Sequence, residues 1–365
     1  MFTVNDLVRT IDAVAPYKYA LSWDNSGFLV GHAGQEVLKI LVSLDFTEKV
    51  LDEAVEKGAN VIVTHHPYFF KPIARLTDET AKGSLILRLI ENHISLLCAH
   101  TNLDVAQGGI NDLLCEMLGL QNVIHAGCAY RQKYYKIVFF VPEGYQQTVT
   151  DALGDAGAGR LGCYARCSFV TKGEGRFQPL DGAQPFIGTP GMVEQVPEYR
   201  VEAIVEEALL NHAVQAGIGA HPYEQPAYDI LPNEVGQAVG EIRIGEYNEA
   251  ITLKDFLKTV RNVLKADKLT YAGTENDLVK RVAVCSGSGA DFLELAKGQG
   301  ADTLLTADAR YHDYQLADEL SMHLIDAGHF ETETIICARL AELFRQNGLP
   351  VEVSQAHQGF YKVFG

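Results

Sequence analysis

Residues 38–70 read LKILVSLD, FTEKVLDEAVEKG and ANVIVTHHPYFF, three consecutive segments of different character. The first and third are short runs of apolar, largely β-branched residues, which are typical of buried strands. The middle segment has the apolar spacing of an amphipathic helix, with Thr47 able to cap its first turn and Gly58 to end it. The stretch therefore predicts a strand–helix–strand unit that ends in a polar loop containing His65 and His66.

The same arrangement recurs near the other end of the chain. Residues 280–313 read KRVAVCSG, SGADFLELAKGQG and ADTLLTADARYHD, again a strand, a helix and a strand before a His-containing loop. Both copies continue into a helix and a further strand, over residues 83–104 and 314–333, that ends in a His-x-x-x-carboxylate pattern. This repetition predicts a pseudo-symmetric α/β domain with a mainly parallel sheet. In such sheets ligands bind beyond the carboxyl ends of the strands, where all the His-rich loops are expected to lie.

Between the two copies, at about residues 128–232, the texture of the sequence changes. The strands and helices predicted there follow the order β-α-β-β-α-β, which is that of a ferredoxin-like fold. We therefore expect a discontinuous α/β core that carries the His-rich loops, residues 1–127 and 233–365, split by an inserted α+β domain at residues 128–232. Two domains also agree with the length, because 365 residues exceed the usual size of one domain.

The composition is that of an ordinary globular protein, with 47% apolar and 21% charged residues. No run approaches the roughly 20 apolar residues of a membrane span, and the first residues lack the apolar run of a signal peptide. The seven cysteines are scattered without a C-x-x-C pair, so we expect reduced thiols and a cytoplasmic protein with no membrane partner. The net charge of −17 makes nucleic acid an unlikely partner, because it repels phosphate backbones.

Two adjacent histidines, His65 and His66, are the first candidates for metal ligands. Side chains of neighbouring residues on an extended chain point to opposite sides, and Pro67 favours an extended conformation at His66. We therefore expect the two imidazoles to serve two ions, or one ion and a supporting partner, and not to converge on one ion. Taken alone, the pair is equally consistent with two solvated loop histidines.

Two carboxylates strengthen the metal interpretation. Asp104 and Glu333 each follow a histidine by four residues beyond an apolar strand. A carboxylate can bridge two ions about 3.5–4 Å apart, which imidazole cannot do. Too few side chains are present to fill two coordination shells, so open positions for water, the mark of a catalytic site, are expected. We predict that two divalent ions, of zinc, iron, manganese or cobalt, are held by His65, His66, Asp104, His329 and Glu333.

Other residues are candidates for roles around these ligands. His100 could be a sixth ligand, a general base or a group that orients a ligand, and we assign it a catalytic role; a hydrogen-bonded strand-end histidine is the structural alternative. Asp308 and His312 take the place of the double histidine in the second copy, where we expect contact with substrate before metal. The glycine loop at 287–289 could admit an anion at a helix N-terminus. The single tryptophan, Trp23, could contact substrate, but we expect it to pack under the metal loops.

These motifs resemble those of the Nif-three-like family with dinuclear metal centres, whose members are also called GTP cyclohydrolase type-two homologues. The matching motifs occur in the family's order over nearly the whole chain, at residues 23–27 (WDNSG), 64–67 (THHP), 100–104, 284–289, 326–329 (DAGH) and 333. The inserted segment resembles the PII-like or CutA-like domain of longer members, on residues 220–224 and 226–228.

The resemblance implies that the five predicted ligands bind metal, with Glu333 shared between the ions, and that the protein forms a ring-shaped homohexamer. It implies a dinuclear metal-dependent hydrolase that acts on a small anionic or nucleotide-like substrate, with GTP as the named candidate. The alternative is a non-catalytic hexameric metal-binding or regulatory protein. The Cys/His zinc-ligand signature of the standard GTP cyclohydrolase is not recognisable in this sequence, so any such activity would rest on a different scaffold.

Overall fold

The computed structural model describes residues 1–234, 236 and 238–360, and these residues form two compact units. Unit 1 comprises residues 1–130 together with the described residues from 239 onward, and unit 2 comprises the described residues of 131–238. The boundaries predicted from the sequence, after residues 127 and 232, fall close to these divisions. Two short strands, β6 (Tyr130–Arg131) and β11 (Ala238–Val239), occur where the chain passes from one unit to the other.

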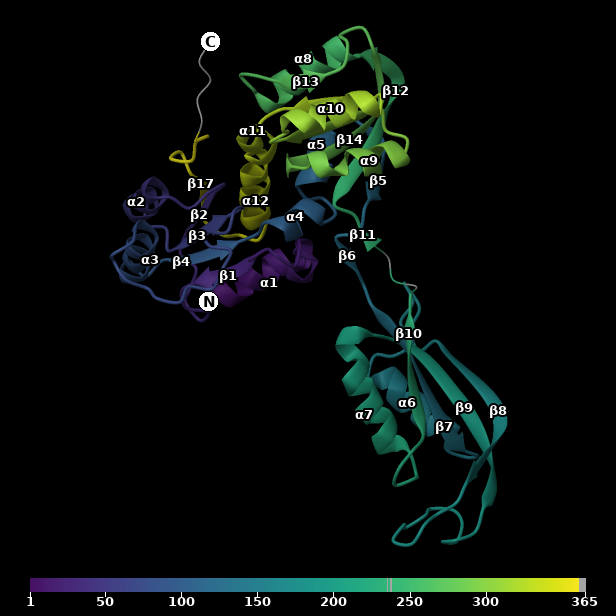
Figure 1. Cartoon of the computed structure of the whole chain (residues 1–365). Coiled ribbons are helices and arrows are strands. Elements are labelled where there is room, and N and C mark those ends of the chain that lie inside the picture. The colour runs from purple at the N-terminus through teal and green to yellow at the C-terminus, as the bar shows by residue number, and fades with distance from the viewer. Residues whose placement is uncertain (235, 237, 361–365) are drawn as a thin grey trace. The chain divides into compact units, whose positions relative to one another are not determined.

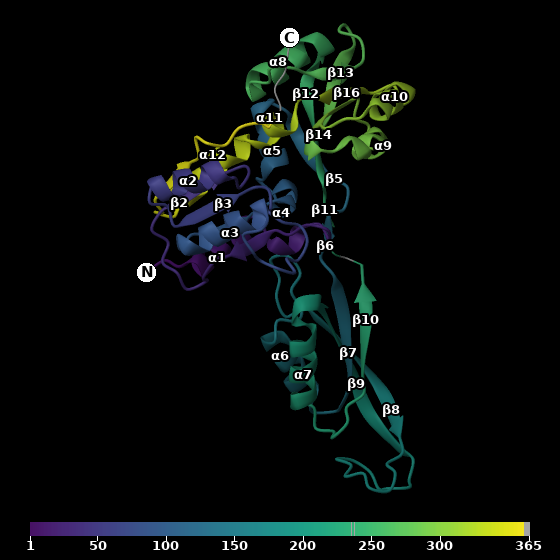
Figure 2. The ribbon, with the colours of Figure 1, turned by 60° about the vertical axis from the view of Figure 1, so that its left-hand side comes forward.

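The first half of unit 1 is built on a five-stranded sheet of order β1-β4-β3-β2-β17 (Figures 1 and 2). All neighbours are parallel except the edge strand β1, which runs antiparallel to β4. The strands are β1 (Gly27–Val30), β2 (Ile40–Ser43), β3 (Val61–Thr64), β4 (Ser95–Cys98) and β17 (Val351–Val353). The strand–helix–strand unit predicted at residues 38–70 is confirmed, because α2 (Glu48–Glu56) joins β2 to β3 and Thr47 caps it by accepting from the Val50 amide.

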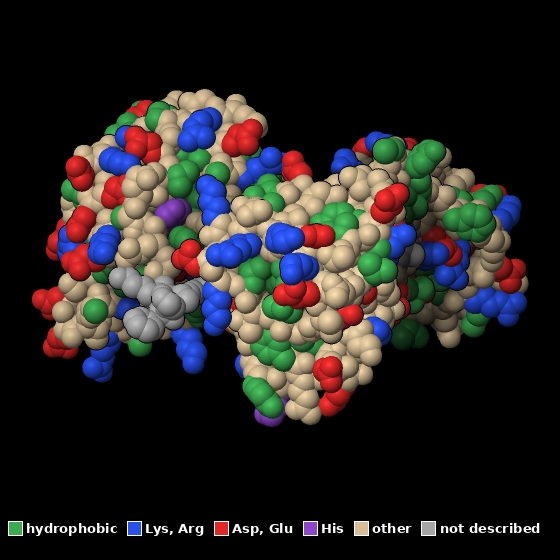
Figure 3. Space-filling view, turned by 90° about the horizontal axis from the view of Figure 1, so that it is seen from above, with side chains coloured by type: hydrophobic (Ala, Val, Ile, Leu, Met, Phe, Trp, Pro, Cys, Tyr) green, Lys and Arg blue, Asp and Glu red, His purple; other side chains and the backbone are tan. Residues whose placement is uncertain are grey.

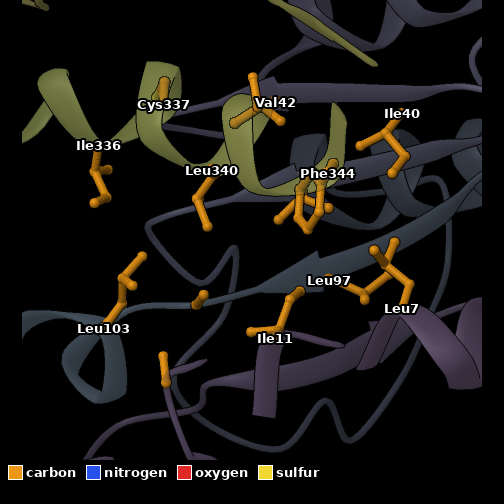
Figure 4. Packing of buried hydrophobic residues seen from close by; sticks show 14 of the residues in the cluster. Leu7, Ile11, Ile40, Val42, Leu97, Leu103, Ile336, Cys337, Leu340 and Phe344 are labelled. Atoms are coloured by element: carbon orange, nitrogen blue, oxygen red, sulfur yellow. The ribbon is translucent and has the colours of Figure 1, made fainter. Parts of the chain in front are cut away.

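Helices cover both faces of this sheet. On one face α1 (Val4–Val14) and α12 (Ile335–Gln346) pack together, and Figure 4 shows Leu7, Leu97 and Phe344 meeting in that apolar cluster. On the other face the sheet packs against α2 and α3 (Ala81–Glu91). Because α12 comes near the end of the chain yet belongs to this first core, it brings the preceding helix α11 (His329–Glu333) to the first sheet.

The second half of unit 1 is a six-stranded sheet of order β13-β16-β15-β14-β12-β5. Its central strands β14, β15 and β16 are parallel, as the repeat predicts, whereas β5, β12 and β13 pair antiparallel with their neighbours. For β5 and β12 the opposite directions agree with the path of the chain, because β5 leads out of unit 1 and the adjacent β12 leads back. The strands are β5 (Gln121–Ala126), β12 (Ile242–Thr252), β13 (Thr270–Ala272), β14 (Leu278–Ser288), β15 (Thr303–Ala307) and β16 (His323–Asp326).

Helices again cover both faces of the sheet. One face packs against α5 and α8, and the other against α9 and α10. The bounds are α5 (Ile110–Met117), α8 (Leu253–Leu264), α9 (Leu293–Gly298) and α10 (Tyr311–Glu319), with α4 (Thr101–Val105) and the short 3-10 turns η1 (Tyr17–Tyr19) and η3 (Ala290–Phe292) completing unit 1. Each copy of the repeat has therefore formed its own sheet with its own core.

A buried arginine on β12 joins the two halves. Arg243 is fully buried, and its Nε donates to Asp112 Oδ1 on α5 at 2.6 Å. Its Nη2 donates to the carbonyl oxygens of Val105 and Ala106, at the end of α4, at 2.7 and 3.0 Å. A charge without water must be matched by hydrogen bonds, and here these partners lie on the segment that follows β4 of the first sheet. The ion pair therefore ties the second sheet to the helices that continue the first.

Asn111 makes a second connection of the same kind. Its Nδ2 donates to the carbonyl oxygens of Asp104 and Glu241 at 3.2 and 3.0 Å, and its Oδ1 accepts from the amide of Ser286 at 2.7 Å. One amide group thus contacts the end of α4, the start of β12 and the end of β14.

Unit 2 is a four-stranded antiparallel sheet of order β10-β7-β9-β8, with α6 and α7 packed on one face. The elements follow the order β-α-β-β-α-β, which is that of a ferredoxin-like fold. The bounds are β7 (Tyr134–Pro142), α6 (Gln146–Asp155), β8 (Ser168–Phe177), β9 (Glu194–Glu206), η2 (Glu207–Leu209), α7 (Leu210–Ala220) and β10 (Tyr228–Asn233).

The surface carries charges of both signs. Figure 3 shows Lys and Arg side chains lying among Asp and Glu side chains over the face drawn. On α8, for example, Lys258 lies 2.8 Å from Asp255, and Lys254 lies 2.6 Å from Glu275. Within the described residues, no helix has the length and apolar character that crossing a bilayer requires.

The Arg243 connection can be tested by removing its side chain. Arg243→Ala leaves Asp112 and two buried carbonyls without their partner, and breaking a buried pair in this way costs about 3–5 kcal/mol of unfolding free energy. The measurement is chemical denaturation followed by circular dichroism. Lys258→Ala serves as the control, since an exposed ion pair contributes roughly 0–1 kcal/mol. Equal, small losses in both variants would show that Arg243 does not hold the halves together.

Candidate metal centre

Polar side chains gather where the carboxyl ends of the parallel strands of both sheets meet. The first sheet contributes residues that follow β2, β3 and β4, and the second contributes α11, which follows β16. The structure brings all five predicted ligands into contact with one another across the two halves, namely His65, His66, Asp104, His329 and Glu333.

His65 is fully buried with its ring held by the main chain. Its Nδ1 donates to the carbonyl oxygen of Ala99 at 2.9 Å, so Nδ1 carries a proton and the ring is fixed with Nε2 toward the cluster. Burial lowers the pKa of His65, but Asp104 and Glu333 raise it above its usual value. Nε2 lies 3.4 Å from Asp104 Oδ1, and neither atom has a hydrogen-bond partner within the described residues. Burial raises the pKa of Asp104, against the opposing effect of His65 and His100. Buried polar atoms without partners are rare in folded proteins, and here two of them face each other.

Glu333 lies between histidines of both halves. Its Oε2 is 2.8 Å from His66 Nε2 and 2.9 Å from His329 Nε2, while its Oε1 is 3.9 Å from His65 Nε2. The carboxylate is almost fully buried, which raises its pKa, but the contacts with His329, His65 and His66 outweigh burial and hold the pKa well below its usual value. An ionised carboxylate thus presents one oxygen to His65 and the other to His66 and His329.

Two further carboxylates contact the Nδ1 atoms of His66 and His329. His66 Nδ1 lies 2.8 Å from Asp45 Oδ1, and His329 Nδ1 lies 2.7 Å from Asp308 Oδ2. Burial lowers the pKa of His66, but Asp45 and Glu333 raise it to about 10; in the same way Glu333 and Asp308 raise the pKa of His329 to about 9. A carboxylate on the far nitrogen is the usual partner of a metal-binding histidine, because it fixes the ring and increases its basicity.

The two adjacent imidazoles differ from the orientation expected of an extended chain. The ring centroids of His65 and His66 are 5.0 Å apart with their planes at 49°, and both rings offer a nitrogen to one cluster with His100, within 4.8 Å of one another. The rings therefore lie closer together than on an extended strand, although each is nearest a different oxygen of Glu333. The reason is that β3 ends at Thr64, so the alternation of side chains along the strand stops before the histidines.

His100 belongs to the same cluster as His65 and His66, and its other ring nitrogen contacts a buried aspartate. Its Nδ1 lies 2.7 Å from Asp24 Oδ1, and the other oxygen of Asp24 accepts from Ser26 and Thr101 at 2.7 and 2.6 Å. Burial raises the pKa of Asp24, but the hydrogen bonds from His100, Thr101 and Ser26 outweigh it and keep that pKa well below its usual value. An ionised Asp24 fixes the Nδ1–H tautomer of His100 and leaves Nε2 as its basic nitrogen.

Trp23 does not pack under the metal loops, so that expectation is wrong. Its side chain is 58% exposed, and its ring lies 6.0 Å from that of Phe70 and 5.8 Å from that of His100. Phe70 is itself 49% exposed. Trp23, before β1, and Phe70, after β3, are tilted at 43° to each other, and each contacts the ring of His100 edge-on. The two rings therefore leave an aromatic surface open beside the histidines.

Asp308 and His312, in the second copy of the repeat, differ from the substrate contacts expected of them. Asp308 contacts His329, whereas His312 is exposed on α10 and lies outside the cluster. The amides of Gly287 and Gly289 already donate to Thr332 and Thr306, so they are not free to receive an anion. Position 287 needs glycine for two reasons. Its φ is +58°, and a Cβ there would lie 2.3 Å from Glu333 Oε1.

Two residues of the centre lay outside the sequence prediction. Asp45 and Asp24 were not assigned roles, although Asp45 ends the same apolar run that begins the first repeat. For Asp45 the available signal was its position in the chain, since a carboxylate that follows β2 must lie at the same sheet edge as the residues after β3.

Gly287→Ala tests whether Glu333 must hold this position. The added methyl group collides with Glu333 Oε1, so we expect metal affinity to fall by roughly 10-fold to 100-fold, as when a supporting contact of a metal ligand is lost. Equilibrium dialysis followed by elemental analysis gives the affinity. Gly298→Ala is the matched control, because a Cβ at Gly298 meets no atom within 4 Å. Unchanged affinity in Gly287→Ala would show that Glu333 has no part in metal binding.

Comparisons with known proteins agree on one family. The family model for Duf34/NIF3 (NGG1p interacting factor 3) matches residues 2–359. A Halalkalibacterium halodurans protein named GTP cyclohydrolase 1 type 2 homolog is 38% identical over 325 residues, covering 88% of this chain and 87% of that protein. Among solved structures, a Bacillus cereus protein related to NIF3 is 35% identical with a TM-score of 0.77, and a Staphylococcus aureus protein is 29% identical with a TM-score of 0.84. Each of the two structures covers 99% of both chains.

Proposed function

The chain belongs to the Duf34/NIF3 family, and we propose that it is a dinuclear metal-dependent hydrolase acting on a small anionic, nucleotide-like substrate. One observation carries the proposal most directly. His65 Nε2 and Asp104 Oδ1 are buried, face each other at 3.4 Å and have no hydrogen-bond partner among the described residues. A cation between them would satisfy both atoms, whereas an empty space would leave two desolvated polar groups at a cost of about 1–3 kcal/mol each.

The proposed ligands fall into two groups around Glu333. His65, with Asp104 beside its Nε2, lies nearest Oε1, and His66 and His329 lie nearest Oε2. A carboxylate with different donors on each oxygen is suited to bridge two ions, which supports two ions per chain over one. The donors are nitrogen and oxygen atoms without thiolate, a set that suits zinc, iron, manganese or cobalt.

Bound divalent ions would supply Lewis-acid activation of water and of an anionic substrate. Two such ions outweigh the charges of Asp104 and Glu333, so the loaded centre would be positive and would attract a phosphate or another anion. Asp45 and Asp308 carry two further negative charges, but they lie behind the histidines, on the far nitrogens of His66 and His329, so the ions would remain the nearest charges to a bound anion. The anionic substrate class is therefore a consequence of the proposed ligand set.

His100 is proposed to move a proton during the reaction. Its Nδ1 is engaged by the buried Asp24, so the ring is held in one tautomer with Nε2 available to accept a proton. The same division of labour between a carboxylate that orients and an imidazole that transfers the proton occurs in hydrolytic triads. His100 also lies within reach of His65 and His66, so it stands beside the place where the ions would bind.

Trp23 and Phe70 point to a planar group in the substrate. Both rings are about half exposed and border His100, at centroid distances of 5.8 and 6.0 Å. An aromatic surface open to solvent beside a positive centre fits a molecule that has a planar base at one end and a phosphate at the other. GTP is the first candidate because relatives are named as GTP cyclohydrolase 1 type 2 homologues.

Metal analysis of the purified protein tests the centre. We expect two divalent ions per chain in the wild type, and loss of metal in His66→Ala and Glu333→Ala, because each removes a donor between the two groups. His312→Ala is the control, since His312 is an exposed histidine outside the cluster. Stoichiometric metal in both donor variants would contradict the site. Sedimentation velocity on the same samples tests the proposed homohexamer, which we expect all the variants to keep.

A substrate screen then separates the enzyme from its alternative. The metal-loaded wild type should hydrolyse at least one member of a panel that begins with GTP and includes other nucleotides and phosphate esters. If it binds two ions yet turns over none of them, the non-catalytic metal-binding or regulatory protein becomes the better interpretation.

His100→Gln distinguishes the proposed proton transfer from the other roles of His100. Loss of general acid–base catalysis lowers turnover by about 100-fold or more, and metal content should stay at the wild-type value. Both are measured on one preparation, with the substrate found in the screen. Loss of metal would instead make His100 a ligand, and unchanged turnover would make it a structural histidine.

A further inference from the structure

Unit 2 contains a cavity that the metal centre does not explain. Its volume is about 560 Å³, within the usual range of small-molecule sites, and it lies wholly within unit 2. Its walls come from the end of β8 and the loop that follows, the segment after α7, and single residues of β7 and β9. In Figures 1 and 2 the loop joining β8 to β9 lies at the bottom of the picture.

Aromatic rings form much of the lining. Tyr223 is at the centre, with the ring of Phe177 at 5.7 Å and that of Phe186 at 6.3 Å. Phe140 on β7 also faces the cavity. Phe186 is 51% exposed and its ring lines the cavity. Several ring faces around one cavity are the arrangement that attracts an organic cation.

A buried carboxylate lies in the same wall. Glu198 on β9 is only 9% exposed, and its Oε1 accepts from the Tyr223 hydroxyl at 3.1 Å. Burial, followed by the charge of Glu198, raises the pKa of Tyr223 above its usual value, so Tyr223 remains a donor to the carboxylate. No ion pair to Glu198 occurs among the described residues, and Lys136 and Arg200 pair with Glu202 instead. A carboxylate removed from water without a cation is costly, and the cavity is the place from which a cation could come.

Space for this carboxylate is provided by a glycine. A Cβ at Gly175 would lie 2.0 Å from Glu198 Oε2, so a larger residue on β8 would displace the carboxylate. The strand pairing of β8 with β9 therefore keeps room beside Glu198 instead of filling it with a side chain.

The neighbouring charges leave Glu198 unneutralised. The lining holds three carboxylates, those of Asp181, Glu198 and Glu224, against one guanidinium, that of Arg176, which is largely exposed and contacts Glu174. His221 supplies no charge either: its Nε2 donates to the Phe140 carbonyl, its Nδ1 accepts from the Tyr223 amide, and burial lowers its pKa. The cavity is thus both aromatic and acidic.

We propose that this cavity binds a small organic ammonium ion, with Glu198 as its counter-ion and Tyr223, Phe177 and Phe186 as its aromatic walls. The cationic head would lie over the rings and beside the carboxylate, while the oxygen-rich rim of Asp181 and Glu224 favours its entry. The site requires neither metal nor the proposed hydrolase activity, so it stands or falls independently of the centre in unit 1.

Calorimetric titration of the full-length protein with choline tests the charge requirement. The matched probe is 3,3-dimethylbutan-1-ol, which has the shape of choline without its positive charge. Tetramethylammonium and spermidine extend the panel to a smaller quaternary ion and to a protonated amine. We expect at least one of the three cations to bind in the millimolar range or tighter and the neutral alcohol to bind at least tenfold more weakly.

Three variants locate the site. Glu198→Gln keeps the size of the side chain and an acceptor for Tyr223, and should lower the affinity for the cation at least tenfold. Phe186→Leu removes one exposed ring without opening the core, and should weaken it about fivefold, as expected for one cation–π contact. Phe169→Leu is the control, because Phe169 is 67% exposed on β8 and does not line the cavity.

The outcomes that overturn the proposal are definite. Equal binding of choline and its neutral analogue would show an apolar pocket without charge selection. Unchanged affinity in both Glu198→Gln and Phe186→Leu would place the cation elsewhere. No binding by any of the three cations at millimolar concentration would show that the carboxylate is not a cation site. Circular dichroism of each variant confirms that unit 2 is folded before the titration is interpreted.

Discussion

The arrangement of unit 1 depends on the buried guanidinium of Arg243. The two halves have separate sheets, and apolar packing links their cores through α5, whose Ile110 belongs to the first core and Leu114 to the second. Arg243 adds a directional requirement, because its hydrogen bonds to Asp112 and to the carbonyls at the end of α4 need a defined position of β12 relative to that helix. A buried charge adds little to the free energy of unfolding, but it disfavours other relative positions of the two halves, because a shift of either half leaves the charge unpaired. Asn111 adds the same kind of selection between α4, β12 and β14.

The candidate metal centre inherits its geometry from this connection. Asp104 is on α4, whose last carbonyls accept from Arg243, and Glu333 ends α11, which α12 anchors in the core of the first sheet. Neither half alone can assemble the group, because His65 and Asp104 come from one and Glu333 and His329 from the other. The carboxyl-end rule for parallel strands places both sets at facing edges, and the glycine at 287 leaves the gap that Glu333 fills. Stability of the interface between the halves and order in the centre are therefore linked.

How much of this could be predicted follows from the range of the interactions. The first strand–helix–strand unit and the Thr47 cap depend on neighbours in the chain, and the sequence predicts them correctly. The five predicted ligands are brought together because the repeat places them after parallel strands. The partners of the histidines were harder: Asp45 and Asp24 meet His66 and His100 across the fold, at separations of 21 and 76 residues. The exposure of Trp23 was mispredicted because average burial of large aromatics says nothing about a ring beside an open site. Arg243 carries no local pattern at all, since its partners are mainly carbonyl oxygens.

The charge of the molecule bears differently on its two proposed sites. A net charge of −17 repels an anionic substrate, but exposed charges are screened beyond about 8 Å at physiological salt, so this repulsion is short in range. Ions held by buried ligands act at short range, where screening is weak, so a loaded centre in unit 1 can attract an anion on an acidic protein. The cavity in unit 2 is acidic without any metal and has aromatic walls, so it selects the opposite sign. An ammonium ion would be repelled from the loaded centre, and a phosphate would be repelled by Glu198, Asp181 and Glu224. No single ligand suits both sites, and the division of the chain into two units is therefore also a division of ligand chemistry.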